Sequence, residues 1–338
     1  MKKIKVGING LGRIGRAFLR AAAKHPEIEV VAVNDLGDKS NMDYLLKYDS
    51  VFGNSGCTLE GIKYLSEKEP SKLPWGELGV DVVVESTGFF ASAEKSQAHL
   101  DAGAKRVVIS APLKEEKGAP FSLQKGAPFS ATVLMGLNEE RLKDCVISSN
   151  ASCTTNAASP VIAILDEVVG IEKAVLNTVH AYTATQTLVD GPAGKKGFRE
   201  GRAAAANIIP SSTGAAVAVT KAYPSLEGKF DGISLRVPVI CGSIADITFI
   251  AKRDTSVEEV NAALTKAAKD KRWQGIFAVA EDELVSSDIL GRPEGAIAEL
   301  SMTRVVGGNL VKVLAWYDNE SGYAAMLVRH VIEAGKHL

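Results

Sequence analysis

The feature that most constrains the fold of this chain is a glycine-rich turn near the amino terminus. Ile4 to Asn9 is a short, largely apolar run that predicts a strand, and Arg13 to Lys24, rich in alanine and leucine, predicts a helix. Between them, Gly10-Leu11-Gly12-Arg13-Ile14-Gly15 reads G-x-G-x-x-G. Gly10 permits a tight turn, Gly12 allows backbone to approach a pyrophosphate, and Gly15 allows helix to pack on strand. The pattern predicts an α/β dinucleotide-binding domain.

An acidic residue at the end of the next strand supports this interpretation. Glu29 to Asn34 predicts a strand and is followed by Asp35, about 20 residues after the last glycine, where a ribose-binding carboxylate belongs. A carboxylate at Asp35 can accept hydrogen bonds from both ribose hydroxyls of NAD, and it would repel the 2′-phosphate of NADP. NAD is therefore the expected cofactor, with NADP as the alternative.

Two further strands are predicted to end in small polar residues. Val80 to Glu85 leads into Ser86-Thr87, and Arg106 to Ile109 leads into Ser110, with a helix predicted between them over Ala93 to Ala102. The carboxyl ends of parallel strands share one edge of a sheet, where such cofactors bind. We therefore expect Ser86, Thr87 and Ser110 near the cofactor, although ordinary loop chemistry explains each of them equally well.

Length and composition exclude several classes of protein. A chain of 338 residues is long enough for two domains. The net charge of −1 gives no reason to expect nucleic acid or an acidic membrane surface as a partner. The four cysteines are widely spaced and lack zinc-site spacing, so neither a metal site nor a disulfide framework is predicted. No signal peptide or transmembrane run is recognisable, and we expect a cytoplasmic protein.

One cysteine lies where a reactive thiol is expected. Cys153 in Asn150-Ala151-Ser152-Cys153-Thr154-Thr155-Asn156 precedes a small, apolar segment that predicts a helix beginning near Thr154. Unpaired backbone N–H groups and the helix dipole favour a thiolate at such a position. A buried structural cysteine is the alternative. The second half of the chain favours the reactive interpretation.

That second half supplies the partners a nucleophile needs. Ala174 to Val179 predicts a strand ending at His180, and Gly232 to Val237 predicts a strand carrying Arg236. The intervening segment Ala181 to Asn207 has little hydrophobic periodicity, and loops of this length are usually functional. A thiol, a base, an arginine and several hydroxyl-bearing turns suit acyl transfer on a phosphorylated aldehyde.

At this point the sequence resembles the phosphorylating glyceraldehyde-3-phosphate dehydrogenases closely and nearly from end to end. The shared blocks are Asn9 to Arg16, Leu45 to Gly53, Glu85 to Gly88, Ala151 to Asn156, Thr178 to Gln186, Asp190 to Pro192, Asn207 to Ala216, Arg236 to Pro238 and Gly307 to Tyr323. The resemblance implies a Rossmann-type domain over residues 1–152, onto which a carboxyl-terminal helix at about 321–338 packs. It implies an α+β catalytic domain with a mostly antiparallel sheet over 153–320.

The resemblance also implies roles for individual residues. Cys153 would attack the aldehyde, and His180 would lower the pKa of the thiol as an ion-pair partner and then act as base. The cofactor contacts implied by the glycine turn, the strand ends and the resemblance are Gly10, Arg13, Ile14, Asp35, Ser86, Thr87, Ser110, Pro192 and Asn319. The two anion sites implied are Thr183, Thr185 and Arg236 for the phosphate of the substrate, and Ser152, Thr154, Thr213 and Gly214 for inorganic phosphate.

The expected activity is oxidation of D-glyceraldehyde 3-phosphate to 1,3-bisphosphoglycerate by a homotetramer. The nearest alternative is an erythrose-4-phosphate dehydrogenase, in which water rather than phosphate splits the thioester and an acid is released. A binding protein without catalysis is a more distant alternative. Val217 and the segment 239–243 depart from the family pattern close to the phosphate sites. Lys117 to Ser122 recurs as Lys125 to Ser130, which indicates a duplicated surface loop.

Overall fold

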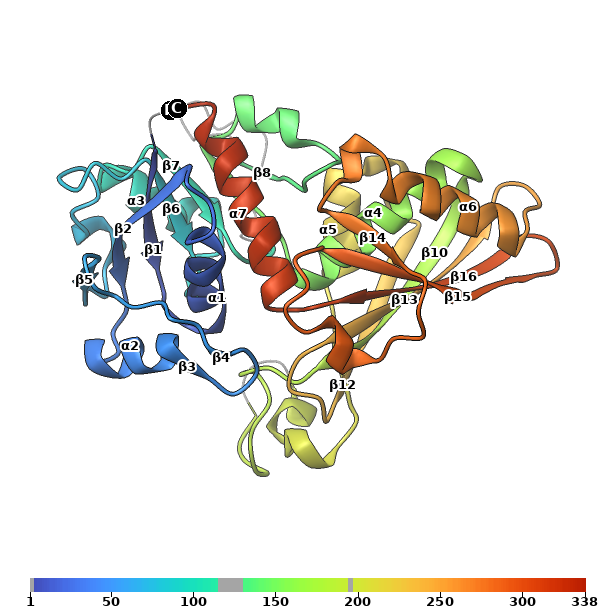
Figure 1. Cartoon of the computed structure of the whole chain (residues 1–338), viewed down its shortest axis with the longest axis horizontal. Coiled ribbons are helices and arrows are strands. Elements are labelled where there is room, and N and C mark those ends of the chain that lie inside the picture. Colours follow the sequence, from blue (N-terminus) through green and yellow to red (C-terminus); the bar gives the residue numbers. More distant parts are fainter. Residues whose placement is uncertain (1–2, 115–129, 194–196) are drawn as a thin grey trace. The chain divides into compact units, whose positions relative to one another are not determined.

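The computed structural model describes residues 3–114, 130–193 and 197–338 and divides them into two compact units, 1–152 with 324–338, and 153–323. Most of the repeated segment 117–130 lies outside the described residues. In each unit a sheet is joined by helices, so the predicted α/β class is confirmed (Figure 1).

In the first unit the described residues form a seven-stranded sheet of order β5-β2-β1-β6-β7-β9-β8, in which all paired strands are parallel. The strands are β1 Ile4–Asn9, β2 Ile28–Asn34, β5 Lys63–Leu65, β6 Val82–Glu85, β7 Arg106–Ile109, β8 Ser130–Thr132 and β9 Ile147–Ser149. The helices are α1 Arg13–Ala22, α2 Lys39–Lys47 and α3 Ala93–Asp101, and β3 Tyr48–Asp49 pairs with β4 Gly53–Asn54. The strand order changes direction at β1, the place where open parallel sheets bind ligands.

Apolar strands and capped helices account for this arrangement. Val82, Val83 and Val84 of β6 are all fully buried, as expected for a strand covered on both faces. Asp38 caps the start of helix α2: its carboxylate accepts hydrogen bonds from the backbone N–H groups of residues 40 and 41.

The carboxyl-terminal helix α7 Ser321–Gly335 contributes its larger part to the first unit. The ring of His330 lies 2.7 Å from the Ser148 hydroxyl through Nε2 and 3.2 Å from Asn150 Oδ1 through Nδ1. Beyond the helix, the carbonyl of His337 accepts a hydrogen bond from Arg106 at 2.6 Å. These contacts join the end of the chain to β7 and β9.

In the second unit the described residues form a seven-stranded mixed sheet of order β11-β12-β10-β13-β16-β15-β14. Its strands are β10 Ile171–Ala181, β11 Ile209–Ser212, β12 Phe230–Val237, β13 Ser243–Ala251, β14 Phe277–Ala280, β15 Ala296–Val306 and β16 Leu310–Tyr317. Helix α4 Cys153–Val168 lies against four of the strands, with α5 Ala215–Ala222 and α6 Val257–Ala268 beside it (Figure 1). Four of the six strand pairs are antiparallel, as predicted.

One face of this second sheet is buried under the helices and the other is open. Alternate residues of β13 and β16 are buried, and the residues between them are partly exposed. On β10 and β12 the outward positions include Val175 and Ile233, which are exposed despite being apolar. An exposed apolar sheet face is a common mark of a protein contact.

Candidate active site

The glycine turn of the first unit has the geometry that its sequence predicts. Gly10 has φ of 96°, in the region that favours glycine. A Cβ atom on Gly15 would lie 2.1 Å from the carbonyl oxygen of Gly10, so α1 approaches the turn as closely as only glycine allows. A Cβ atom on Gly12 would meet no described protein atom within 4 Å, which leaves open space beside the start of α1. That space fits a pyrophosphate held by the first N–H groups of the helix.

A cavity of about 600 Å³ lies beside this turn. It is lined by Asn9, Gly10, Gly12, Asn34, Asp35, Leu36, Glu67, Lys68, Ser86, Thr87, Phe89 and Phe90. Four of the predicted cofactor contacts are therefore brought together by the ends of β1, β2 and β6. Asp35 accepts the N–H groups of Leu11 at 2.7 Å and Gly37 at 2.8 Å, which fixes its carboxylate on the wall of the cavity.

The other predicted cofactor contacts lie outside this lining. Arg13, in the first turn of α1, forms an ion pair with Asp49 at 2.7 Å, and Ile14 is half-buried. Ser110 follows β7, and its N–H donates to the carbonyl of Glu85 at 2.9 Å. Pro192 and Asn319 belong to the second unit.

A buried polar cluster beneath the cavity escaped the sequence analysis. Glu85 is 1 % exposed, and its carboxylate accepts the Asn9 amide at 2.6 Å, the Thr87 N–H at 2.8 Å and the Thr87 hydroxyl at 2.5 Å. His99 adds a fourth donor at 3.1 Å. Since Trp75 can only donate, and donates to His99 Nδ1 at 3.0 Å, the ring proton is on Nε2, facing Glu85. The cluster fixes Asn9 and Thr87, two residues of the cavity wall.

In the second unit, the predicted nucleophile is the first residue of α4. The preceding turn is strained, because Ala151 has φ of 52° with a fully buried side chain. Left-handed conformations of residues other than glycine persist where the surroundings enforce them, often at functional sites. Residue Cys153 is partly exposed at this helix start, but protein atoms surround its thiol.

His180 and Arg236 converge on the thiol because of strand register. They are direct partners in the parallel pair β10 and β12, at the carboxyl ends of both strands. The Sγ atom of Cys153 lies 3.4 Å from His180 Nε2. The other ring nitrogen, Nδ1, lies 2.7 Å from the carbonyl of Ala181 and 2.6 Å from Arg236 Nη1. The nucleophile and the base predicted from the sequence are therefore in contact.

The protonation of this pair differs from the sequence prediction. Burial raises the pKa of the Cys153 thiol, and the Arg236 guanidinium opposes that shift. Burial, reinforced by the same guanidinium, lowers the pKa of His180 to about 3. The predicted lowering of the thiol pKa is wrong for this structure, because the loss of solvent outweighs the helix amides. The arrangement is a neutral thiol beside a neutral imidazole. In the tautomer whose Nδ1 donates to the carbonyl of Ala181, Nε2 can accept a proton.

Tyr317 is a second component of the site that the sequence analysis did not single out. It is fully buried at the end of β16, with its ring edge-on to His180 at a centroid distance of 5.8 Å. Its hydroxyl lies 2.8 Å from the Thr154 hydroxyl and 2.7 Å from that of Thr178. Thr154, predicted to bind phosphate, thus has its hydroxyl on Tyr317, which fixes the first turn of α4.

Asn319 has an amide whose orientation is set by its neighbours. Its Oδ1 accepts the Gly242 N–H at 3.1 Å and the Ser243 hydroxyl at 3.0 Å. The Nδ2 group of this side chain has no hydrogen-bond partner among the described residues, although the residue is 5 % exposed. The amide is therefore oriented to donate to a ligand, as the predicted contact with a carboxamide oxygen requires.

The predicted anion-binding residues lie on two hydroxyl-bearing turns. Thr183 and Thr185, directly after β10, have hydroxyl oxygens 3.0 Å apart. Thr213 accepts the Ala215 N–H at 3.2 Å, beside the exposed Gly214 at the start of α5.

On Arg236 only Nη1 has a hydrogen-bond partner among the described residues, and the buried Nε has none. These unused donors suit an anion. Ser152, at the end of the first unit, is partly exposed.

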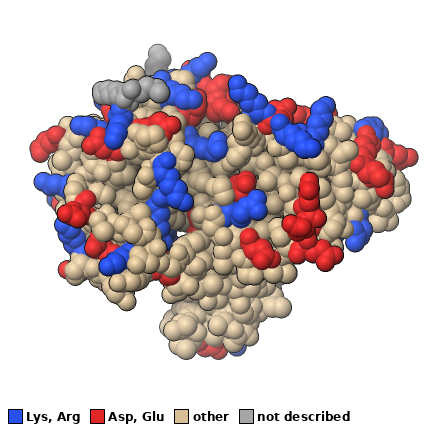
Figure 2. Space-filling view, in the orientation of Figure 1, with Lys and Arg blue, Asp and Glu red and all other residues tan. Residues whose placement is uncertain are grey.

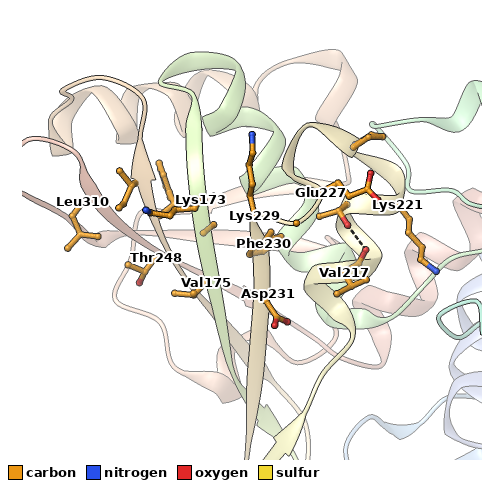
Figure 3. Close-up of a pocket in the computed structure, with 16 residues that line it drawn as sticks. Lys173, Val175, Val217, Lys221, Glu227, Lys229, Phe230, Asp231, Thr248 and Leu310 are labelled. Atoms are coloured by element: carbon orange, nitrogen blue, oxygen red, sulfur yellow. Dashed lines mark hydrogen bonds between the residues drawn. The ribbon is translucent and has the colours of Figure 1, made fainter.

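A further cavity, of about 860 Å³, contains none of the candidate residues. It lies between the strand residues Val175 and Thr248 and the α5 residues Val217 and Lys221 (Figure 3). The Thr220 hydroxyl on its wall donates to the carbonyl of Val217. Neither Cys153 nor His180 lines this cavity, so it is not the proposed reaction site. Val217, a departure from the family pattern, lies here.

Comparison with known proteins assigns the family. Residues 4–93 match the model of the NAD-binding domain of glyceraldehyde 3-phosphate dehydrogenase, and residues 152–319 match that of its carboxyl-terminal domain. The chain belongs to the glyceraldehyde-3-phosphate dehydrogenase family. It is 45% identical to the glyceraldehyde-3-phosphate dehydrogenase of Streptomyces coelicolor, 46% to that of Mycobacterium avium and 46% to that of Mycobacterium tuberculosis. Each match covers 99% of this chain and 99% of the relative.

Membership of the glyceraldehyde-3-phosphate dehydrogenase family confirms the predicted class of enzyme. The chain is an oxidoreductase whose first unit binds NAD, and the cavity beside Gly12 and Asp35 is where the described residues fit that cofactor. Among the described residues, each helix is too short or too polar to cross a membrane.

Proposed function

We propose that this chain oxidises D-glyceraldehyde 3-phosphate to 1,3-bisphosphoglycerate, with NAD as hydride acceptor and inorganic phosphate as second substrate. The observation that carries the proposal is the 3.4 Å contact between Cys153 Sγ and His180 Nε2 at the start of α4, in a chain of this family. A thiol in contact with a neutral imidazole is the pair that covalent aldehyde oxidation requires.

The residues of the second unit account for bond formation at the aldehyde. The neutral His180 ring takes the thiol proton, and Cys153 Sγ attacks the carbonyl carbon to give a thiohemiacetal, whose oxygen receives that proton. NAD, when bound, supplies the acceptor for the hydride that leaves this carbon. His180 Nε2 takes the hydroxyl proton as the thioester forms, and the Cys153 N–H at the helix start stabilises the developing oxyanion.

The same pair serves the second half of the reaction. Inorganic phosphate attacks the thioester carbon, the bond from carbon to sulfur breaks, and His180 returns its proton to the leaving thiolate. Ser152, Thr154, Thr213 and Gly214 would hold the attacking phosphate, with Thr154 contributing through its backbone because its hydroxyl bonds Tyr317. Thr183, Thr185 and Arg236 would hold the phosphate of the substrate, since hydroxyls and a guanidinium offer donors to a dianion.

For the cofactor we assign the adenosine half to the cavity of the first unit, with Asp35 on the ribose and Gly10, Arg13 and Ile14 at the pyrophosphate. Ser86, Thr87 and Ser110 would line the continuation of this site. Asn319 Nδ2 would hold the nicotinamide carboxamide, and Pro192 would favour NAD over NADP.

The test is NADH formation from glyceraldehyde 3-phosphate and NAD, with and without inorganic phosphate. Phosphate-dependent turnover, or turnover with arsenate in its place, is expected. A rate of turnover that does not depend on inorganic phosphate would support the hydrolytic reaction of the erythrose-4-phosphate type, which no feature of the site favours. Absence of turnover with NAD still bound would overturn the assignment of the aldehyde.

We further propose a homotetramer, built through two surfaces of the second unit. One is the open sheet face, where Val175 is 60% exposed. The other is the segment after β10, where Phe198 is 94% exposed and Leu188 and Val189 are also exposed. Since a tetramer with dihedral symmetry needs at least two distinct self-complementary contacts, two separate apolar surfaces support this assembly.

A cytoplasmic location is proposed on the chemistry of the cysteines. All four, each within the described residues, are free thiols, which suits a reducing compartment. On the face of the molecule in Figure 2, basic and acidic side chains are interspersed, in keeping with a net charge of −1. We therefore propose small-molecule substrates and copies of this chain as the partners.

A further inference from the structure

A buried carboxylate lies close to the proposed site for the phosphate of the substrate, where a negative charge is unexpected. Glu200, in the long segment after β10, is 6% exposed. Its two oxygens accept from two different elements: Oε1 accepts the hydroxyl of Ser211 in β11 at 2.5 Å, and Oε2 accepts the side-chain amide of Gln186. The Glu200 carboxylate therefore accepts one side-chain hydrogen bond on each of its oxygens.

The hydrogen bond to Glu200 orients the side-chain amide of Gln186, a residue that is 8% exposed. An amide can be turned end for end, and only its neighbours decide which end is the donor. Here the carboxylate of Glu200 requires Nε2 on one side, and the Thr183 N–H, 2.9 Å from Oε1, requires the oxygen on the other. Both contacts select the same orientation.

The orientation of the amide determines how the threonine hydroxyls can act. Gln186 Nε2 donates its second proton to Thr185 Oγ1 at 3.0 Å. The Thr183 Oγ1 atom accepts the Thr185 N–H at 3.4 Å and lies 3.0 Å from Thr185 Oγ1. Because each hydroxyl oxygen already accepts from the protein, each hydroxyl proton needs another acceptor. Among the described residues the acceptors are the neighbouring hydroxyl at 3.0 Å and, for Thr183, Gln186 Oε1 at 3.4 Å. An anion oxygen placed beside the pair can take these protons in their place.

Donors are what a phosphate dianion needs, since its oxygens can only accept. We propose that Glu200 and Gln186 are positioning residues for the phosphate of the aldehyde: the carboxylate fixes the amide, and the amide fixes Thr183 and Thr185 as donors. This inference rests on the function proposed above. It also explains how an acid stabilises an anion site without touching the anion.

The inference is tested by steady-state kinetics of Glu200→Leu with two aldehydes, D-glyceraldehyde 3-phosphate and unphosphorylated D-glyceraldehyde, at saturating NAD and inorganic phosphate. Without the carboxylate only the Thr183 N–H still selects the orientation of the amide, and a reversed amide would take the Thr185 proton. We expect the KM for the phosphorylated aldehyde to rise about tenfold with kcat within about twofold, which corresponds to the loss of about 1.4 kcal/mol of ground-state binding. The kcat/KM for unphosphorylated glyceraldehyde should not change.

Two further variants separate positioning from folding. Glu200→Gln should restore most of the KM, because its side-chain oxygen can still accept the Gln186 amide and the Ser211 hydroxyl can reverse. Gln186→Met, which has similar volume and no amide, should reproduce the KM defect if Glu200→Leu does not fold. Asp190→Asn is the matched control, since this exposed acid of the same segment pairs with Arg202 and the Ala203 N–H.

Three results would overturn the inference: an equal loss of kcat/KM for both aldehydes, an unchanged KM in both Glu200→Leu and Gln186→Met, or an equal defect in Asp190→Asn. Failure of the proposed function is a separate result, because the unmodified protein would then lack phosphate-dependent turnover of the phosphorylated aldehyde.

Discussion

At the scale of single residues, the site depends on a few contacts that a substitution can remove cleanly. Cys153 provides the only sulfur within reach of His180 Nε2 among the described contacts. Replacing Cys153 with Ser leaves a far weaker nucleophile beside the same base. We expect Cys153→Ser to reduce turnover at least about a thousandfold, while NAD affinity, measured by fluorescence titration, stays within about twofold. Turnover near that of the unmodified protein would remove Cys153 from the role of nucleophile.

A second residue-scale prediction concerns His330, fully buried in α7. Burial lowers the pKa of His330 to about 3, whereas an unfolded histidine titrates near 6.5. Between these values the unfolded chain binds a proton that the folded chain does not, so stability from the neutral ring is complete above pH 6.5 and is lost as the pH falls. Each pH unit below 6.5 should cost about 1.4 kcal/mol from this group.

Urea denaturation of the unmodified protein and His330→Gln at pH 7.5 and pH 5.0 measures this contribution. Glutamine can retain hydrogen bonds to Ser148 and Asn150 but does not titrate. We expect the stability difference between the two proteins to shrink by about 2 kcal/mol on acidification. An identical loss of stability in both proteins would show that His330 takes up no proton on unfolding.

At the scale of elements, two glycines of the turn between β1 and α1 have different roles: Gly15 allows close packing, and Gly12 leaves space for a ligand. A methyl group at Gly15 would meet the carbonyl of Gly10 at 2.1 Å, whereas one at Gly12 would meet no described protein atom. Gly15→Ala should destabilise the first unit by about 1–3 kcal/mol because helix and strand must separate. Gly12→Ala should cost less than about 1 kcal/mol.

Although Gly12→Ala should change stability little, it should weaken the binding of NAD. Its methyl group would occupy the space that we assign to the pyrophosphate, so we expect the NAD dissociation constant, measured by calorimetry, to rise at least about tenfold. Thermal unfolding of both variants without NAD provides the comparison. Unaltered NAD affinity in Gly12→Ala would place the pyrophosphate elsewhere.

The elements also show what the sequence could and could not predict. Local patterns were sufficient for β1 and β7, which have the predicted bounds, and for α1, which ends two residues early. The His180–Arg236 register was not predictable, because it depends on the pairing of β10 with β12 across 56 residues of chain. The same limit explains why Glu85, Glu200 and Tyr317 escaped notice: each is an ordinary residue whose partners are set by tertiary structure. Burial likewise raises the pKa of the Cys153 thiol, whereas the helix start alone would lower it.

At the scale of the whole molecule, each unit has a separate part in the proposed chemistry. The parallel sheet of the first unit gathers strand ends around a cavity, and the mixed sheet of the second places a base and a guanidinium beside a helix start. The carboxyl-terminal helix then returns the chain to the first unit. The first unit is therefore completed only when the carboxyl-terminal residues 324–338 have been made.

The proposed tetramer gives the last prediction, because its two surfaces can be altered separately. Val175 lies on the open sheet face and Phe198 in the segment after β10. Burying a glutamate at either position should cost more free energy than formation of that subunit contact provides. Val175→Glu and Phe198→Glu should each convert the tetramer to a dimer, since the other surface remains, and the double variant should be a monomer. Sedimentation velocity measures these states directly. Val168 is an exposed residue at the end of α4, on the helix-covered side of the sheet, and the Val168→Glu variant should remain a tetramer. A tetramer in all four variants would place the contacts on other surfaces, and a dimer from Val168→Glu would show that a new charge, rather than its position, causes the dissociation.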